Sequence, residues 1–292
     1  MSETISFTEE PFEKQAYDMP QLWENDWFGE EEHDRVRKIL EIVPTDVSSI
    51  LDVGCGNGLF LNFTNQNHRG RFSRLCGTDR SAVALQHVQT EKTVARIDRI
   101  PFDSTSFDLV SCMEVLEHLT LSVYPSALQE LARIARKYVL ISVPYKEVLM
   151  SNLVACPSCF TKFHPDYHVR SFSEDTMATL MEPLGLKQIG QWKLGMSVSY
   201  ADRELRSRLR NWVTGNGGAL FPPIGLCPVC GYRDTEALDN ALDQRKLQKA
   251  RRLGQGGSNL NTEQETWARR VISRLIPPTV NYRWIVGLYE KR

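Results

Sequence analysis

Short aliphatic runs alternate with amphipathic segments over the first two thirds of the chain. The runs are rich in Val, Ile and Leu, as buried strands are, and each is followed by apolar residues at helical spacing. Strands are expected over residues 49–53, 74–79, 93–97, 107–112, 138–143 and 186–194, and helices over 31–43, 59–67, 81–90, 122–136 and from Ser173 to about Pro183. This alternation predicts an α/β fold with a parallel, doubly wound sheet.

Three glycines at alternate positions, Gly54, Gly56 and Gly58, follow directly on the first expected strand. Glycines let the backbone turn sharply and lie close to a ligand, and the N–H groups at the start of the next helix favour a polar or anionic ligand group. The second strand ends at Asp79, near the offset at which a doubly wound sheet presents a carboxylate to a ribose diol. The spacing is G-x-G-x-G, whereas dinucleotide folds show G-x-G-x-x-G. The turn is therefore predicted to bind a nucleotide cofactor other than a dinucleotide.

With Asp52 ahead of it, this turn resembles motif I of the class I S-adenosylmethionine (SAM)-dependent methyltransferases. The resemblance continues in the order and spacing of that family, through Ile100-Pro101-Phe102-Asp103, Ser106-Phe107-Asp108-Leu109-Val110 and Glu114-Val115-Leu116-Glu117-His118-Leu119. Within the family the chain looks most like the type 11 and ubiquinone-biosynthesis methyltransferases. The resemblance covers residues 35–195 and the last strand, and it implies a Rossmann-like sheet of seven strands with SAM at its carboxyl edge.

The resemblance assigns the SAM site residue by residue. The glycine backbones are expected beside the methionine moiety, Asp79 is expected to accept from the ribose hydroxyls, and Arg80 is expected to flank the adenine. Family members usually place an Asp shortly before the Pro-Phe pair to bind the adenine amino group. Arg96 stands at that position here, with Asp98 as the candidate substitute. The expected cofactor-binding residues are Asp52, Gly54, Gly56, Gly58, Asp79, Arg80, Asp98 and Glu114.

The last strand of the sheet is displaced along the chain. In this family the seventh strand follows the sixth by a short hairpin, but the good candidate here covers residues 282–289. The expected organisation is an aromatic N-terminal lid or strap over residues 1–33, a SAM-binding core over 34–199, a Cys-containing helical insertion over 200–280 and the final core strand over 281–292. Within the insertion, helices are expected around residues 238–247 and over 262–276.

Composition and charge narrow the function classes. With 41% hydrophobic residues the 292-residue chain can bury a full core, no apolar run approaches the ~20 residues of a membrane helix, and the N-terminus is acidic. A soluble, cytoplasmic protein is expected. Residues 200–292 hold 16 Lys and Arg against 9 Asp and Glu, and residues 1–199 hold 19 against 27. The basic part could meet an acidic substrate or nucleic acid, although a solvated helix face explains most such runs.

Acidic and imidazole residues after the fourth expected strand admit two functional interpretations. On a helical turn, Glu114, Glu117 and His118 would share one face and could hold a divalent cation that binds an acceptor's hydroxyls. Such a trio resembles the metal sites of ubiquinone-biosynthesis O-methyltransferases and of small-RNA 3′-end 2′-O-methyltransferases. The same string also occurs in family members not thought to use a metal, where its first residues line the SAM pocket. His118 is then a candidate general base, because imidazole suits proton transfer near neutral pH.

Four of the seven cysteines form two matching knuckles, Cys156-Pro157-Ser158-Cys159 and Cys227-Pro228-Val229-Cys230. Both have the C-P-x-C spacing that directs two thiolates to one tetrahedral ion. The knuckles lie further apart than in a compact zinc ribbon, so they can meet only through the tertiary fold. One structural zinc bound by Cys156, Cys159, Cys227 and Cys230 is expected, and the other three cysteines are expected to be buried apolar residues.

Further acceptor-site candidates follow the fifth expected strand. Residues 163–172 read Phe-His-Pro-Asp-Tyr-His-Val-Arg-Ser-Phe, and in related methyltransferases a His-x-Arg-x-Phe element enters the acceptor site from this loop. His164 and His168 are candidate bases on that resemblance, and Tyr145 is a weaker candidate. The expected catalytic residues are therefore His118, His164, His168 and Tyr145.

The sequence as a whole predicts a SAM-dependent methyltransferase, most simply one that methylates an oxygen of a small molecule, a saccharide or a lipid-linked intermediate. Ser111-Cys112-Met113-Glu114 is unlike the Asn-Pro-Pro-Tyr type of exocyclic nucleobase N-methyltransferases, which argues against base methylation. Two alternatives stay open. One is an RNA 2′-O-methyltransferase, and the other is a SAM-fold module that binds nucleic acid or protein through the basic insertion.

Overall fold

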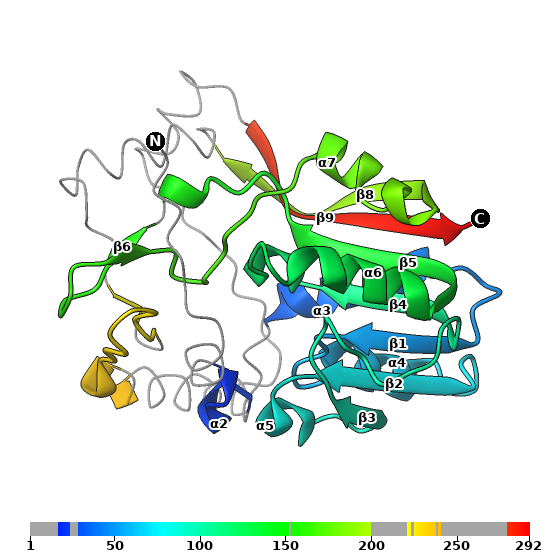
Figure 1. Cartoon of the computed structure of the whole chain (residues 1–292), viewed down its shortest axis with the longest axis horizontal. Coiled ribbons are helices and arrows are strands. Elements are labelled where there is room, and N and C mark those ends of the chain that lie inside the picture. Colours follow the sequence, from blue (N-terminus) through cyan, green and yellow to red (C-terminus); the bar gives the residue numbers. More distant parts are fainter. Residues whose placement is uncertain are drawn as a thin grey trace, which may run out of the picture. The chain divides into compact units, whose positions relative to one another are not determined.

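Seven strands form one sheet in the order β3-β2-β1-β4-β5-β9-β8 in the computed structural model (Figure 1). Their bounds are β1 Ser49–Val53, β2 Arg74–Asp79, β3 Glu91–Val94, β4 Phe107–Met113, β5 Ala135–Pro144, β8 Leu186–Ser199 and β9 Thr279–Lys291. The strands from β3 to β5 pair in parallel, and β9 runs antiparallel to β5. The predicted Rossmann-like sheet is confirmed, including the displaced last strand. From β1 the chain first adds β2 and β3 on one side and then β4 and β5 on the other, so the strand order switches direction between β1 and β4. Doubly wound sheets bind ligands at the carboxyl ends of the strands beside such a switch.

The structure describes residues 17–23, 29–151, 153–199, 221–222, 225–237, 239–240 and 279–292. These belong to two units. The sheet unit comprises residues 8–147, 168–196 and 282–292, and the cysteine unit comprises residues 1–7, 148–167 and 197–281. The helix expected over 262–276, most of that around 238–247, and the first sixteen residues of the expected lid lie outside the described residues.

Helices cover both faces of the sheet unit. They are α3 Glu30–Ile42, α4 Leu59–Asn67 and α5 Ala82–Leu85 on one face, and α6 Tyr124–Ile134, α7 Glu174–Thr179 and the 3₁₀ turn η3 Glu182–Leu184 on the other (Figure 1). Adjacent strand residues point to opposite faces. Accordingly, Ile50 packs with the α3 and α4 cluster and Leu51 packs with the α6 cluster. Every residue of β1 is buried, as expected of a strand covered on both sides.

One helix is shorter than expected because a side chain hydrogen-bonds to backbone groups near its end. α4 has the expected bounds, but α5 ends at Leu85, whereas a helix to residue 90 was expected. The Asn62 side chain explains the early end, because it donates to the carbonyl of His87 and accepts from the N–H of Gln89. These are backbone groups that a longer helix would use itself.

The remaining short elements are α2 Pro20–Trp23, the 3₁₀ turns η1 Leu116–His118 and η2 Leu149–Ser151, and the strands β6 Val154–Ala155 and β7 Lys162–Phe163. β6 and β7 pair antiparallel in the cysteine unit. Val154, Cys156, Phe163 and Cys227 form the buried cluster of that unit. The first knuckle is therefore the turn that joins β6 to β7.

A buried carboxylate fixes the amino-terminal end of β4. Asp108 Oδ2 accepts from the N–H of Ser48 at 2.9 Å, the hydroxyl of Ser48 at 2.8 Å and the N–H of Ser49 at 3.2 Å, and Arg136 Nη1 lies 3.0 Å from Oδ1. Burial alone would raise the pKa of Asp108. The hydrogen bonds from Ser48 and the charges of Lys137 and Arg136 outweigh burial and lower the pKa to about 2.

We predict that Asp108→Asn lowers the free energy of unfolding at neutral pH by about 2 kcal/mol, because the pKa falls from 3.8 to about 2 on folding. Since the folded-state pKa is depressed, this stabilisation is complete above about pH 4 and is lost as the pH falls towards about 2. Urea unfolding at several pH values measures it. The difference between wild type and variant should shrink over that interval. Asp103→Asn, an exposed carboxylate in the preceding loop, is the control, and a pH-independent loss in Asp108→Asn would contradict the prediction.

Candidate active site

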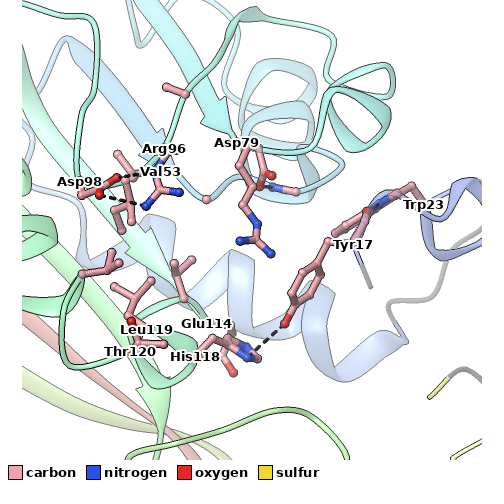
Figure 2. Close-up of a pocket in the computed structure, with 17 residues that line it drawn as sticks. Tyr17, Trp23, Val53, Asp79, Arg96, Asp98, Glu114, His118, Leu119 and Thr120 are labelled. Carbon is pink, nitrogen blue, oxygen red and sulfur yellow. Dashed lines mark hydrogen bonds and ion pairs between the residues drawn. The ribbon is translucent and has the colours of Figure 1, made fainter. Parts of the chain in front are cut away.

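A pocket opens where β1, β2 and β4 end, within the sheet unit (Figure 2). Its empty space, which includes part of the open mouth, is about 990 Å³. Its walls come from the glycine turn, from the end of β2, from the segment 95–98, from the loop after β4 and from the N-terminal segment. The pocket therefore lies at the carboxyl edge of the sheet, as the sequence predicted.

The glycine turn forms the floor of this pocket. Gly54 and Gly56 line it with φ values of 72° and 53°, in the left-handed region that favours glycine. The N–H groups of Gly54 and Cys55 donate to the carbonyl of Thr78, at 2.7 and 3.0 Å. Gly58 instead precedes α4, and a Cβ there would lie 2.9 Å from Val88 Cγ2. Gly58 thus permits close packing of the turn and is not among the lining residues.

Asp79, at the end of β2, points its carboxylate at the turn. Oδ2 accepts from the N–H of Gly56 and Oδ1 from the N–H of Ser81, both at 2.8 Å. Burial raises the pKa of Asp79, and the N–H donors of Ser81, Gly56 and Arg80 oppose the rise. Because an ionised carboxylate offers about four lone-pair sites, Asp79 keeps acceptor capacity for a ligand diol.

Asp52 lies behind the turn and is not among the residues that line the pocket. It is 3% exposed, and the Ser111 hydroxyl donates to Oδ1 at 2.7 Å. Burial raises the pKa of Asp52 to about 7, with Ser111 opposing and the charge of Asp79 adding to the rise. A cationic ligand group in the pocket would favour its ionised form.

Charged side chains surround the expected adenine end. Arg80, Arg96 and Asp98 all line the pocket, and Arg96 Nε lies 3.0 Å from Asp98 Oδ1 (Figure 2). Burial, followed by the charge of Arg96, lowers the pKa of Arg80 to about 10. The Arg80 guanidinium lies 5.1 Å from the ring centre of Tyr17.

Two aromatic residues of the N-terminal segment also line the pocket. Tyr17 points its hydroxyl at His118 Nδ1, at 3.2 Å, and the Trp23 indole N–H donates to the Tyr17 carbonyl (Figure 2). Ser81 Oγ donates to Asp18 Oδ1 at 2.7 Å and contacts the Tyr17 carbonyl at 3.2 Å. The sequence marked this segment as aromatic but gave no sign of which rings reach the pocket.

Glu114, the first residue after β4, has charged and polar partners from distant parts of the chain. Arg35 Nη1 lies 2.9 Å from Oε1, and the Trp284 indole N–H donates to Oε2 at 2.9 Å. Its backbone has φ 57°, which is unusual for a residue with a side chain and stores strain at the pocket wall. Burial raises the pKa of Glu114, and Arg35 and Trp284 oppose the rise.

Three other groups gather beside Glu114. His118 Nε2 lies 4.0 Å from Glu117 Oε1, and the rings of His118 and His168 meet edge to face with centroids 4.7 Å apart. One ligand atom from each of Glu117, His118 and His168 lies within 4.8 Å of the other two. Glu147 contacts His168 Nδ1. The metal-site hypothesis named Glu114 with Glu117 and His118, but the structure groups His168 with Glu117 and His118.

Two expected catalytic residues lie elsewhere. His164 belongs to the cysteine unit, where it is buried and its Nδ1 accepts from the N–H of Asp166. The Tyr145 hydroxyl donates to Glu174 at 2.5 Å, and Lys146 and Lys193 also pair with that carboxylate. Tyr145 is not among the lining residues of the pocket, so the structure gives no support to its role there.

The two cysteine knuckles meet in the cysteine unit. Cys156 and Cys230 have sulfurs 3.6 Å apart, Cys159 and Cys227 also 3.6 Å, and all four lie within 4.8 Å of one another. The knuckles share one backbone pattern. The first Cys of each donates its N–H to the carbonyl five residues on, that of Thr161 or Tyr232.

The strand order and the glycine-turn pocket at the carboxyl edge define a class I methyltransferase fold. A sequence model of the methyltransferase-domain family matches residues 28–190, so the chain belongs to that family. The family match confirms the sequence prediction of a class I SAM-dependent methyltransferase domain.

Individual relatives are more distant. An uncharacterized protein of Methanocaldococcus jannaschii is 32% identical over 130 residues, which are 43% of this chain and 53% of that protein. The match thus spans about half the length of that curated relative. The cyclase SpnF is 13% identical, with a TM-score of 0.52 over 95% of this chain and 94% of its own. A SAM-dependent methyltransferase from Archaeoglobus fulgidus is 12% identical, with a TM-score of 0.47 over 96% and 98%. A cyclase with this fold shows that the fold alone does not fix the reaction.

Within the described part of the chain, no helix is both long enough and apolar enough to cross a membrane.

We predict that Gly54→Ala destabilises the chain more than Gly70→Ala. Both glycines have positive φ, 72° and 81°, so each variant places a Cβ in left-handed backbone at a cost of about 1 to 2 kcal/mol. A Cβ at Gly54 would also lie 2.3 Å from Val115 Cγ2, whereas no described atom lies within 4 Å of one at Gly70. Denaturant unfolding should show about 1 kcal/mol or more of additional loss in Gly54→Ala. Equal losses would mean that Val115 moves aside at no cost.

Proposed function

We propose that this protein transfers a methyl group from SAM to a hydroxyl oxygen of a small molecule, a saccharide or a lipid-linked intermediate. One observation carries the proposal. A single pocket has the glycine turn and the Asp79 carboxylate at one end, and the His118 imidazole in the loop after β4. A cofactor site and a proton-accepting group thus share one cavity, which is what methylation of a hydroxyl requires.

The residues present fit SAM. Asp79 has acceptor capacity for the ribose hydroxyls, and Gly54 and Gly56 line the pocket where the methionine moiety is expected. Arg80 and Asp98 lie where the adenine is expected. SAM supplies a methyl group on a sulfonium, whose leaving group is a neutral thioether. The protein must therefore mainly align the acceptor and exclude competing water.

The residues at the His118 end of the pocket favour methylation of a hydroxyl oxygen over methylation of a nucleobase nitrogen. A hydroxyl is a weak nucleophile until it loses its proton, and the His118 imidazole, with His168 packed against it, provides titratable groups where that proton would leave. The Tyr17 and Trp23 rings extend this wall of the pocket. They support the role of an aromatic lid for the N-terminal segment. Most of the basic insertion, on which the nucleic-acid alternative depends, lies outside the described residues.

We predict that Asp79→Asn weakens SAM binding by roughly 10- to 100-fold, because a hydrogen bond to a charged acceptor contributes about 1.5 to 3 kcal/mol. Titration calorimetry of the full chain measures this. Asp46→Asn is the matched control, since Asp46 is an exposed carboxylate that pairs with Lys137 at the other edge of the sheet, and its SAM affinity should equal that of wild type. An Asp79→Asn affinity within twofold of wild type would remove Asp79 from the site.

The acceptor class is tested in the same system with methyl-labelled SAM and panels of phenols, saccharides and RNA. Label recovered in an ether of a small hydroxyl compound supports the proposal. Label found on nitrogen, or on RNA in a reaction that weakens steeply with added salt, contradicts it and favours the nucleic-acid alternative.

We also propose that the four clustered cysteines bind one structural zinc. Zinc-to-sulfur distances near 2.3 Å place tetrahedral sulfurs roughly 3.8 Å apart, close to the 3.6 Å of the two nearest pairs. The N–H groups of Ser158 and Cys159 point at Cys156 Sγ, at 3.4 and 3.5 Å, as the thiolates of a negatively charged site require. The ion would tie the turn between β6 and β7 to the second knuckle.

We predict that the purified chain retains one zinc that survives dialysis against a weak chelator, and that Cys227→Ser loses it. Elemental analysis measures the zinc. Because no ligand comes from the sheet unit, the variant should become protease-sensitive in the cysteine unit while its SAM affinity changes little. Cys76→Ala, which removes a buried sulfhydryl of β2, is the control and should keep the zinc. Zinc-free wild type prepared without chelator would defeat the proposal.

A further inference from the structure

The Trp23 indole packs against the glycine turn. A Cβ built on Gly56 would lie 3.0 Å from Trp23 Cζ3 and 3.4 Å from Cη2, so the six-membered ring of the indole contacts that glycine. The other end of the indole is held by a hydrogen bond, because its N–H donates to the Tyr17 carbonyl at 2.7 Å. Trp23 and Gly56 both line the pocket (Figure 2). The ring therefore borders the empty space beside the turn.

The segment that carries this ring is anchored to the end of β2. Ser81 Oγ donates to Asp18 Oδ1 at 2.7 Å and lies 3.2 Å from the Tyr17 carbonyl. The N–H of Ser81 donates to Asp79 Oδ1 at 2.8 Å. Ser81 thus ties the segment to the strand end that presents the Asp79 carboxylate. The position of the Trp23 ring is set by the same turn that supplies the expected ribose acceptor.

For SAM bound as proposed above, the positive charge falls beside Gly56. The sulfonium sulfur joins the ribose to the methionine side chain, so it lies between the groups that hold these two parts. The Asp79 carboxylate, expected at the ribose hydroxyls, accepts from the N–H of Gly56 at 2.8 Å. Gly54 and Gly56 line the pocket where the methionine moiety is expected. The two parts of the cofactor therefore meet next to the glycine that Trp23 contacts.

We propose that the Trp23 ring recognises the sulfonium charge and raises the affinity of the site for SAM relative to its demethylated product, S-adenosylhomocysteine (SAH). An aromatic face attracts a cation within about 6 Å of the ring centre, and Trp attracts it most strongly. SAH has a neutral thioether at the same atom, so it lacks this attraction. Tyr17 is less suited to the role, because the Arg80 guanidinium already lies 5.1 Å from its ring centre.

This inference rests on the proposed function and concerns cofactor exchange rather than the transfer step. Methyl transfer removes the positive charge from the sulfur. A contact that stabilises this charge therefore favours bound SAM over the transition state and does not speed the transfer. It does favour SAM in competition with SAH for the empty pocket. Trp23 is thus a specificity residue of the cofactor site.

Titration calorimetry of the full chain with SAM and with SAH tests the proposal. Trp23→Leu keeps an apolar side chain and removes the ring, so it should weaken SAM binding roughly 3- to 30-fold more than SAH binding. Trp23→Phe keeps an aromatic face and should retain part of the selectivity. Trp192→Leu removes a partly exposed indole of β8 that does not line the pocket. It is the matched control and should leave both affinities within about twofold of wild type.

Sinefungin separates recognition of the charge from recognition of the methyl group. In this analogue an amine-bearing carbon replaces the methylated sulfur, and the amine is protonated at neutral pH. Its affinity should therefore fall in Trp23→Leu as the SAM affinity does. If sinefungin binding changes only as little as SAH binding, Trp23 contacts the methyl group rather than the charge, and the proposal is overturned.

The same titrations distinguish failure of this inference from failure of the proposed function. If wild type binds neither SAM nor SAH, the proposed cofactor is wrong. If wild type binds both and Trp23→Leu weakens both equally, the ring is only an apolar cover, and the proposed cofactor stands without charge recognition. Unchanged affinities for both in Trp23→Leu lead to the same conclusion. SAH binding retained in Trp23→Leu shows that the variant is folded.

Discussion

The Asp79 carboxylate accepts hydrogen bonds from the N–H groups of both Gly56 and Ser81, and most of the pocket depends on this. β1 and β2 are parallel and end side by side, and the chain turns out of the sheet after each of them. The N–H groups in these turns then need acceptors other than a neighbouring strand. One carboxylate at the end of β2 satisfies a donor from each turn. Ser81 in turn contacts the Tyr17 carbonyl, and the Tyr17 hydroxyl reaches His118. The glycine turn, the aromatic wall of the pocket and His118 are therefore connected through Asp79, which keeps acceptor capacity of its own.

The sequence predicted the parallel core well and the short peripheral elements less well. β1 and α4 have their expected bounds, because strands buried on both faces and a helix that follows a fixed glycine turn carry strong hydrophobic patterns. The position of Asp79 was predictable for the same reason, since the turn and one crossover set its offset. α5 was overestimated because a side chain of α4, Asn62, takes backbone groups near its end. The sequence around α5 cannot show that Asn62, 25 residues before His87, hydrogen-bonds to the backbone there.

In the candidate site, too, the residues of a local motif were predictable and their distant partners were not. The string from Glu114 to His118 was visible, but which of its carboxylates has partners was not, because those partners are distant in the chain. Arg35 pairs with Glu114 from α3, and Trp284 donates to it from 170 residues further on. Two carboxylates three residues apart acquire different chemistry only through such distant partners. Glu114 pairs with Arg35, whereas the Glu117 carboxylate has no hydrogen-bond partner among the described residues and lies 4.0 Å from His118 Nε2. Pairs of titratable groups with such unequal surroundings are typical of functional sites.

The cysteine knuckles were predictable in spacing, whereas their meeting depends on the tertiary fold. In the described part of the cysteine unit, a buried cluster comprises Val154, Cys156, Phe163 and Cys227. Sulfurs 3.6 Å apart are too distant for a disulfide bond, which is near 2.0 Å, and all four cysteines are free. The proposed zinc would account both for the spacing of the sulfurs and for the burial of Cys156 and Cys227 in this cluster.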